Sequence, residues 1–95
     1  AAICAAPIVL ARAGIIEGKK VTSYPGFEDQ LSGCLYQEQN VVRDGNIITA
    51  RGPALAVDLA IAIIEYFLGQ EKADELKKKI LYSEYIQLIT GMVYA

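Results

Sequence analysis

The stretch that decides the fold is Ala2–Pro7, which reads Ala-Ile-Cys-Ala-Ala-Pro. Two small residues, Ala2 and Ala6, lie two positions before and two positions after Cys4. This is the spacing of small residues in a nucleophile elbow, where a strand turns directly into a helix and leaves no room for bulk beside the nucleophile. Pro7 suits the first turn of a helix, where its missing N–H is no loss. The sequence therefore predicts a strand-to-helix turn that presents Cys4.

The helix after this turn is expected to span Pro7–Ala13, to be covered on most sides, and to end at Gly14. In such a turn the N–H groups of Ala5 and Ala6 would be free, and the helix N-terminus would favour a negatively charged thiolate at Cys4. The same N–H groups could hold an oxyanion formed on an attacked carbonyl. On the motif alone the alternative is a small, buried, unreactive cysteine, which is what most free cysteines are.

Composition excludes several function classes. Nine basic and eleven acidic residues give a net charge of −2, so a duplex-binding surface is not expected and we predict no nucleic-acid partner. No apolar run reaches the roughly 18 residues that cross a bilayer, so we predict no membrane partner and a cytoplasmic protein. Two cysteines and no histidine exclude a zinc finger and any Cys–His or Ser–His dyad built from this chain alone. We therefore predict neither a metal nor a cofactor.

The size of the chain sets a second limit. It has 95 residues, of which 54% are hydrophobic, whereas a domain this short buries only roughly 60–65% of its unfolded surface. So small a core does not usually absorb that much apolar surface. We expect either an oligomer or one part of a larger core.

The segment after the first helix is expected to place a tyrosine at the end of a strand. Lys20–Ser23 is a strand candidate, and Tyr24-Pro25-Gly26 then breaks regular structure. In open α/β sheets ligands bind at such strand ends, although an X-Pro-Gly turn is usually only a turn. Phe27–Ser32 is predicted to form a surface helical turn. Cys34 has no CxxC partner, and we interpret it as a thiol without chemistry.

A hairpin is predicted in the middle of the chain. Asn40–Arg43 and Asn46–Thr49 flank the dipeptide Asp44-Gly45, which is typical of a two-residue turn with both residues at positive φ. The β-branched side chains of these segments favour strands. We interpret the hairpin as scaffold.

Helices are predicted for the C-terminal part. Pro53–Leu68, closed by Gly69, is apolar nearly all round, which indicates a helix buried by other elements or by a partner. Arg51, just before it, is open to three interpretations: a surface charge, an ion-pair partner, or an anchor for an anionic ligand. Gln70–Leu81 is amphipathic, and the tail 82–95 should dock on something, although its local structure stays open.

Four stretches in order carry a resemblance to a known family. They are Ala2–Pro7, Lys20–Pro25, Val42–Thr49 and Ala50–Pro53, the last followed by the apolar helix. Over about residues 1–81 the chain resembles the ThiJ/PfpI superfamily, in the branch of the parkinsonism-associated protein deglycase (DJ-one). The resemblance implies a flavodoxin-like α/β fold, a three-layer sandwich. Residues 1–95 would then be a single partial domain, the C-terminal half.

The resemblance also implies partners and site residues. The missing N-terminal half would supply the family's acidic residue, which hydrogen-bonds the cysteine, and the protein would be a homodimer. Cys4 would be the nucleophile and the Ala5 N–H part of the oxyanion site, while Tyr24, Pro25 and Pro53 would be candidates for the substrate pocket. The deglycase branch often has a histidine where this chain has Tyr24. A tyrosine can donate a hydrogen bond to a substrate oxygen, but it is a poorer general base.

Three functions remain open at this point. The first is a cysteine-dependent enzyme of the glyoxalase or deglycase type, acting on small reactive aldehydes or glycated adducts. The second is a redox-sensing or chaperone-like stress protein in which Cys4 oxidises to a sulfinate. The third is a cysteine peptidase, which is disfavoured because the peptidase-like branch has a histidine directly after the cysteine and this chain has Ala5.

Overall fold

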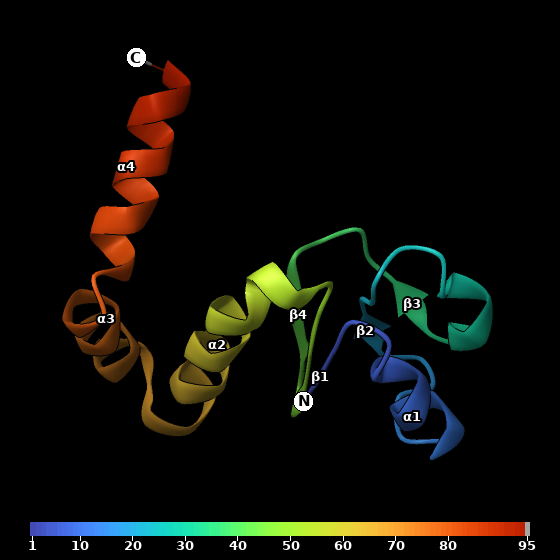
Figure 1. The fold of residues 1–95 in the computed structure, drawn as a ribbon. Coiled ribbons are helices and arrows are strands. Elements are labelled where there is room, and N and C mark those ends of the chain that lie inside the picture. Colours follow the sequence, from blue (N-terminus) through green and yellow to red (C-terminus); the bar gives the residue numbers. More distant parts are fainter. Residues whose placement is uncertain (95) are drawn as a thin grey trace. The chain divides into compact units, whose positions relative to one another are not determined.

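The computed structural model describes the backbone of residues 1–94 and the side chains of residues 1–91, and it divides the chain into two compact units. Residues 1–63 form a mixed α/β unit, and residues 64–95 form a helical unit (Figure 1). The predicted α/β class is thereby confirmed.

The strands of the first unit form two small sheets. The larger sheet has the order β1-β5-β4, and the smaller one pairs β2 with β3. The bounds of the five strands are β1 Ala2–Ile3, β2 Lys20–Val21, β3 Leu35–Tyr36, β4 Val41–Asp44 and β5 Ile47–Ala50. β1 runs parallel to β5, with Ile3 opposite Ala50, and β4 runs antiparallel to β5. The ends of β1 and β5 therefore meet at one edge, where the chain leaves both strands at Cys4 and Arg51.

The core of this unit lies between the smaller sheet and its helical segments. Its buried members are Ile16, Val21, Leu31 and Ile47. Partly buried residues of α1 (Pro7–Arg12) and of the segment after the 3₁₀ helix η1 (Glu28–Leu31) pack against this cluster. β2 contributes Val21 to this cluster, so the core holds β2 in place. The chain continues from the end of β2 to Tyr24.

The predicted hairpin is present, but its register was wrong by one residue. Asp44 pairs with Ile47, so the turn residues are Gly45 and Asn46, of which only Gly45 has a positive φ, +61°. A glycine at the first turn position is what a type II′ turn requires. Asp44 stays in the strand because its side-chain Oδ2 accepts a hydrogen bond from the Lys20 N–H at 2.8 Å, which ties β4 to β2.

The expectation that the first helix is covered on most sides was wrong, whereas burial of the second helix by a partner stays a prediction. In α1 only Pro7 is buried, and Val9 is 67% exposed. The predicted helix Pro53–Leu68 begins as a 3₁₀ turn, η2 (Pro53–Leu55), and continues as α2 (Ala56–Leu68), in which only Ile61 is buried. Several apolar side chains of both helices are exposed among the described residues, Val9 in α1 and Val57, Phe67 and Leu68 in α2, which fits one part of a larger core.

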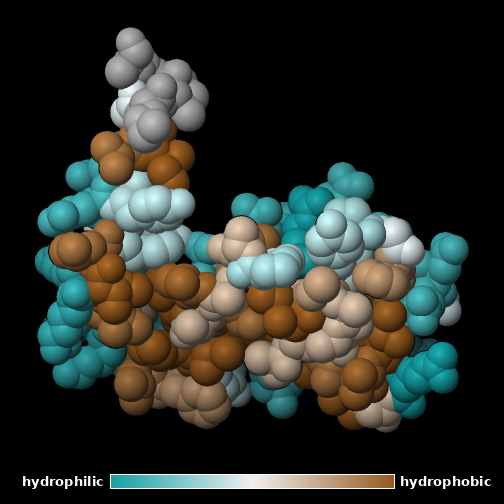
Figure 2. Space-filling model, viewed as in Figure 1, coloured by the Kyte–Doolittle hydropathy of each residue, from teal (hydrophilic) through white to brown (hydrophobic). Residues whose placement is uncertain are grey.

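The second unit contains α3 (Gln70–Lys79) and α4 (Tyr82–Tyr94), which pack against each other. The tail whose structure the sequence left open is thus a helix through residue 94. A left-handed residue, Leu81, with φ +61°, separates the two helices. Apolar side chains reach the surface of both units (Figure 2). Within residues 1–94, no helix is long and apolar enough to cross a membrane.

Candidate active site

The turn at Cys4 is an abrupt change from strand to helix. β1 ends at Ile3, Cys4 has φ +63°, and α1 begins at Pro7. A non-glycine residue in this left-handed region costs roughly 1–2 kcal/mol. Within the described residues only Leu81 shares such a φ. Strained turns of this kind are found where a strand-to-helix elbow presents a nucleophile.

The amides around this turn are not equivalent. The Cys4 N–H donates to the Ala50 carbonyl at 3.0 Å, and the Ala6 N–H donates to the Ile3 carbonyl at 3.0 Å. The expectation that the Ala6 N–H is free was therefore wrong, because the tight turn closes a hydrogen bond across itself. The Ala5 N–H has no acceptor among residues 1–94. In this part of the chain it is the amide that an oxyanion beside Cys4 could use.

Tyr24 lies directly beside the elbow. Its N–H donates to the Cys4 carbonyl at 2.9 Å. Two residues earlier, the Thr22 N–H donates to the Thr49 Oγ1 at 3.0 Å in a fully buried hydrogen bond. These two bonds hold the segment after β2 against the ends of β1 and β5, while the Tyr24 side chain stays 48% exposed. No sequence signal singled out the link between Thr22 and Thr49, because it joins positions 27 residues apart.

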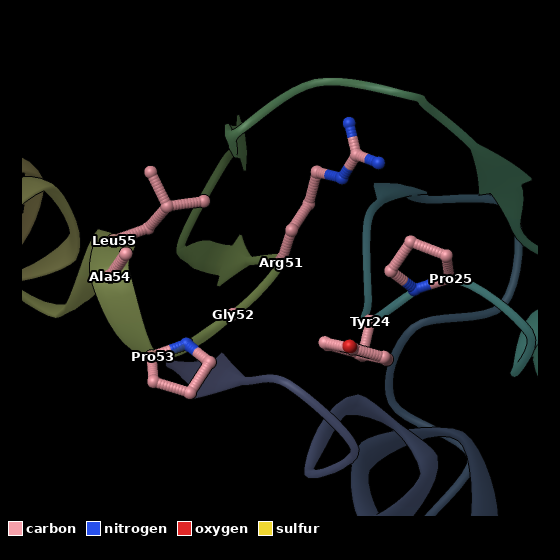
Figure 3. A pocket seen from close by; sticks show the side chains of 7 residues that line it. All are labelled: Tyr24, Pro25, Arg51, Gly52, Pro53, Ala54 and Leu55. Atoms are coloured by element: carbon pink, nitrogen blue, oxygen red, sulfur yellow. The ribbon is translucent and has the colours of Figure 1, made fainter.

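A pocket of about 280 Å³ opens next to Tyr24. Its lining comes from two segments, the turn after β2 and the chain that follows β5 (Figure 3). The lining residues are Tyr24, Pro25, Arg51, Gly52, Pro53, Ala54 and Leu55. Gly52 faces the Tyr24 ring, and a Cβ on it would lie in ordinary van der Waals contact, 3.6 Å from the Tyr24 Cδ2.

The structure therefore brings three of the predicted site residues together and leaves two outside. Tyr24, Pro25 and Pro53 line this one pocket, whereas Cys4 and Ala5 do not belong to its lining. Cys4 is nevertheless joined to both walls, through Tyr24 and through Ala50. Sequence reasoning did not single out the continuous run 51–55 as a wall, although its position directly after a strand was a usable signal.

Cys34 lies in different surroundings. It follows η1 and packs against the core cluster of residues 1–63. Burial, and secondarily the negative charge of Glu17, raise the pKa of the Cys34 thiol above its usual value. A raised pKa leaves less of the nucleophilic thiolate at neutral pH. This packing agrees with the prediction of a thiol without chemistry.

Among residues 1–94, no group of three or more histidine, cysteine, aspartate or glutamate side chains is arranged to hold a metal ion.

Comparison with known proteins places this geometry in a family. The profile of the DJ-1/PfpI family matches residues 1–66. The chain is 47% identical over 85 residues to Protein DJ-1alpha of Drosophila melanogaster, covering 87% of this chain and 39% of that protein. It is 37% identical over 81 residues to the glutathione-independent glyoxalase DJR-1.2 of Caenorhabditis elegans, covering 83% of this chain and 43% of that one.

The solved structures agree with the sequence comparison. The crystal structure of Drosophila melanogaster DJ-1beta is similar with a TM-score of 0.79 and 47% identity, over 84% of this chain and 45% of that one. The chain thus spans less than half the length of the relatives it matches. Its partial sheet is that of the C-terminal half of a flavodoxin-like domain, as the resemblance implied. From the profile match and these similarities together, the chain belongs to the DJ-1/PfpI family.

Proposed function

We propose that the protein is a cysteine-dependent enzyme that acts on small reactive aldehydes, with Cys4 as the nucleophile. The observation that carries the proposal is the left-handed backbone of Cys4, φ +63°, between β1 and α1. A residue with a Cβ adopts this conformation only at a cost, and strain of this kind is concentrated at functional sites. A relative 37% identical to this chain is a glutathione-independent glyoxalase, which supports the same class of reaction here.

The chemistry with methylglyoxal starts with addition. The Cys4 thiolate forms a C–S bond to the aldehyde carbon, and the carbonyl electron pair moves to oxygen. The Ala5 N–H is positioned to donate to this oxyanion. Transfer of the hydrogen from the former aldehyde carbon to the neighbouring carbonyl carbon, through an enediol, then gives a thioester of lactate. Water hydrolyses the C–S bond and regenerates the thiol, so the net reaction is methylglyoxal plus water to lactate.

The proton transfers need a group that this chain does not supply at the elbow. It has no histidine, and Tyr24 is a poor general base near neutral pH. We infer that an acidic residue of the N-terminal half of the domain performs this step, with residues 1–95 as the C-terminal part of the same domain. The proposal includes a homodimer, because the exposed apolar side chains of α1 and α2 need to be covered by another part of the protein. It also places the protein in the cytoplasm.

The experiment measures lactate formed from methylglyoxal by the intact protein, by its Cys4→Ala variant and by a matched Cys34→Ala variant. We expect Cys4→Ala to lose at least about 100-fold in kcat/KM, because no other thiol lies at the elbow. Cys34→Ala is expected to stay within about threefold. Equal rates for the wild type and Cys4→Ala would remove the proposal. Oxidation of Cys4 by mild peroxide, in a protein without aldehyde turnover, would instead favour the redox-sensing hypothesis.

A further inference from the structure

The pocket beside the elbow holds one charged residue in an otherwise uncharged lining. Arg51 is that residue, and the others are apolar, aromatic or glycine. The side chain of Arg51 extends from the wall of the pocket and carries its guanidinium away from the Pro53 ring (Figure 3). Within residues 1–94, no carboxylate forms an ion pair with this guanidinium. Its hydrogen-bonding capacity in this part of the molecule is therefore available to a ligand.

Arg51 is joined to the elbow through the backbone, although it lies far from Cys4 in the sequence. Arg51 directly follows Ala50, whose carbonyl accepts the hydrogen bond from the Cys4 N–H. The opposite wall, Tyr24, is bonded to the Cys4 carbonyl. Both walls of the pocket are thus joined to the backbone of Cys4. A small molecule that is attached to the sulfur and extends into this pocket would contact apolar surface with its carbon chain and the guanidinium with its far end.

A guanidinium recognises a particular chemistry. Its planar fork of donors matches a carboxylate in a two-bond arrangement and is always charged. The net charge of the chain is −2, so its overall charge does not attract anions. An anionic ligand would therefore depend on a specific contact such as Arg51. We propose that Arg51 makes the enzyme selective for 2-oxoaldehydes that carry a carboxylate at the other end of the molecule. This inference rests on the proposed function.

The corresponding reaction balances without a further reagent. With 4,5-dioxopentanoate, the Cys4 thiolate adds to the aldehyde carbon, the hydrogen shifts to the neighbouring ketone carbon, and water cleaves the thioester. The product is 2-hydroxyglutarate, and the thiol is restored. The distal carboxylate takes no part in these steps. Arg51, which binds it, therefore contributes to substrate binding and selectivity and not to the chemical steps.

The test compares kcat/KM for 4,5-dioxopentanoate with kcat/KM for the uncharged 2-oxopentanal in the intact protein. The ratio of the two values is expected to fall at least tenfold in Arg51→Met, mainly through KM for the anionic substrate, and to recover in part in Arg51→Lys. Arg43→Met is the matched control, because Arg43 lies on β4 outside the pocket, and its ratio should equal that of the wild type. An unchanged ratio in Arg51→Met overturns the inference.

A binding measurement separates this inference from the proposed function. Calorimetric titration of Cys4→Ala with 2-hydroxyglutarate needs no turnover. We expect the Kd to rise at least tenfold when Arg51→Met is added to Cys4→Ala, and to rise with ionic strength in the parent variant. If methylglyoxal is not converted but this shift is seen, the proposed function fails and the anion site stands. If lactate forms but Arg51→Met does not change the Kd, only the anion site fails.

Discussion

Cys4 and Cys34 carry the same thiol in opposite kinds of surroundings. Cys4 lies at a strained left-handed position between a strand and a helix, beside the Ala5 amide, which has no acceptor within the described part of the chain. Cys34 lies after a 3₁₀ turn against a packed apolar cluster, where burial raises the pKa of its thiol. The difference shows that backbone geometry and packing, rather than the presence of a thiol, separate a candidate nucleophile from a structural residue. Substitutions on the two sides of this comparison should therefore have different consequences.

The largest effect is expected in the core beside Cys34. Leu31 is 2% exposed and belongs to the cluster that Cys34 contacts. Leu31→Ala should lower the free energy of unfolding of the intact protein by about 2–4 kcal/mol, because it removes buried methyl groups and leaves a cavity. Chemical denaturation measures this value. Asp29→Ala, an exposed neighbour in η1, is the control, and an equal loss in both variants would contradict the packed environment assigned to Cys34.

Thiol reactivity should differ by at least about tenfold. At pH 7 iodoacetamide is expected to alkylate Cys4 faster than Cys34, because the raised pKa of Cys34 lowers the fraction of its reactive thiolate. The rate at Cys34 should climb as the pH increases through the alkaline range, where its thiolate forms. Peptide mass spectrometry gives both rates from one sample.

The control for this measurement is Glu17→Gln. Removing this negative charge eliminates the smaller of the two causes that raise the pKa of Cys34, so its alkylation should become modestly faster at pH 7. Faster labelling of Cys34 than of Cys4 in the wild type would reverse the roles assigned to the two thiols.

Replacing each cysteine by glycine should change the free energy of unfolding by a smaller amount, with opposite signs at the two sites. Cys4→Gly should raise the free energy of unfolding by up to about 1 kcal/mol, because glycine relieves the left-handed strain but also increases the entropy of the unfolded chain. Cys34→Gly should lower it by about 1 kcal/mol or more, since packing is lost and no positive φ is relieved. Destabilisation of equal size at both positions would mean that Cys4 carries no strain.

Sequence reasoning identified the segments that have strong local signals. The small residues around Cys4 predicted the elbow, and Pro7 and Gly14 bracket a helix that ends within one residue of the predicted limit. The apolar run after Pro53 predicted a helix that the structure contains, with its first turn wound as a 3₁₀ helix. These features depend on neighbours in the chain, which is why they can be recognised without the fold.

Features fixed by distant contacts were missed. The strand β3 has two residues, and it exists because the Leu35 N–H bonds to the Lys19 carbonyl and the Gln37 N–H to the Val21 carbonyl. The hairpin register depends on the bond from Lys20 to Asp44, since Asp-Gly and Gly-Asn are both acceptable turn dipeptides.

The same limit applies to the candidate site. Tyr24 could be named from the sequence because it follows a predicted strand, and the family resemblance implied Pro25 and Pro53 beside it. The sequence could not predict that Arg51 and Leu55 line the same pocket, because this requires the ends of β2 and β5 to lie side by side. The position of the Tyr24 ring beside Gly52, where an added Cβ would lie 3.6 Å from the Tyr24 Cδ2, is likewise a product of the fold.

The most direct test of the account is to locate the covalent adduct. The intact protein is mixed with methylglyoxal, quenched with acid during turnover so that a thioester is not hydrolysed, and mapped by peptide mass spectrometry. The account predicts loss of free thiol at Cys4 during turnover, with Cys34 unmodified over the same interval. A free Cys4 thiol while lactate accumulates, or an adduct formed first at Cys34, would contradict it.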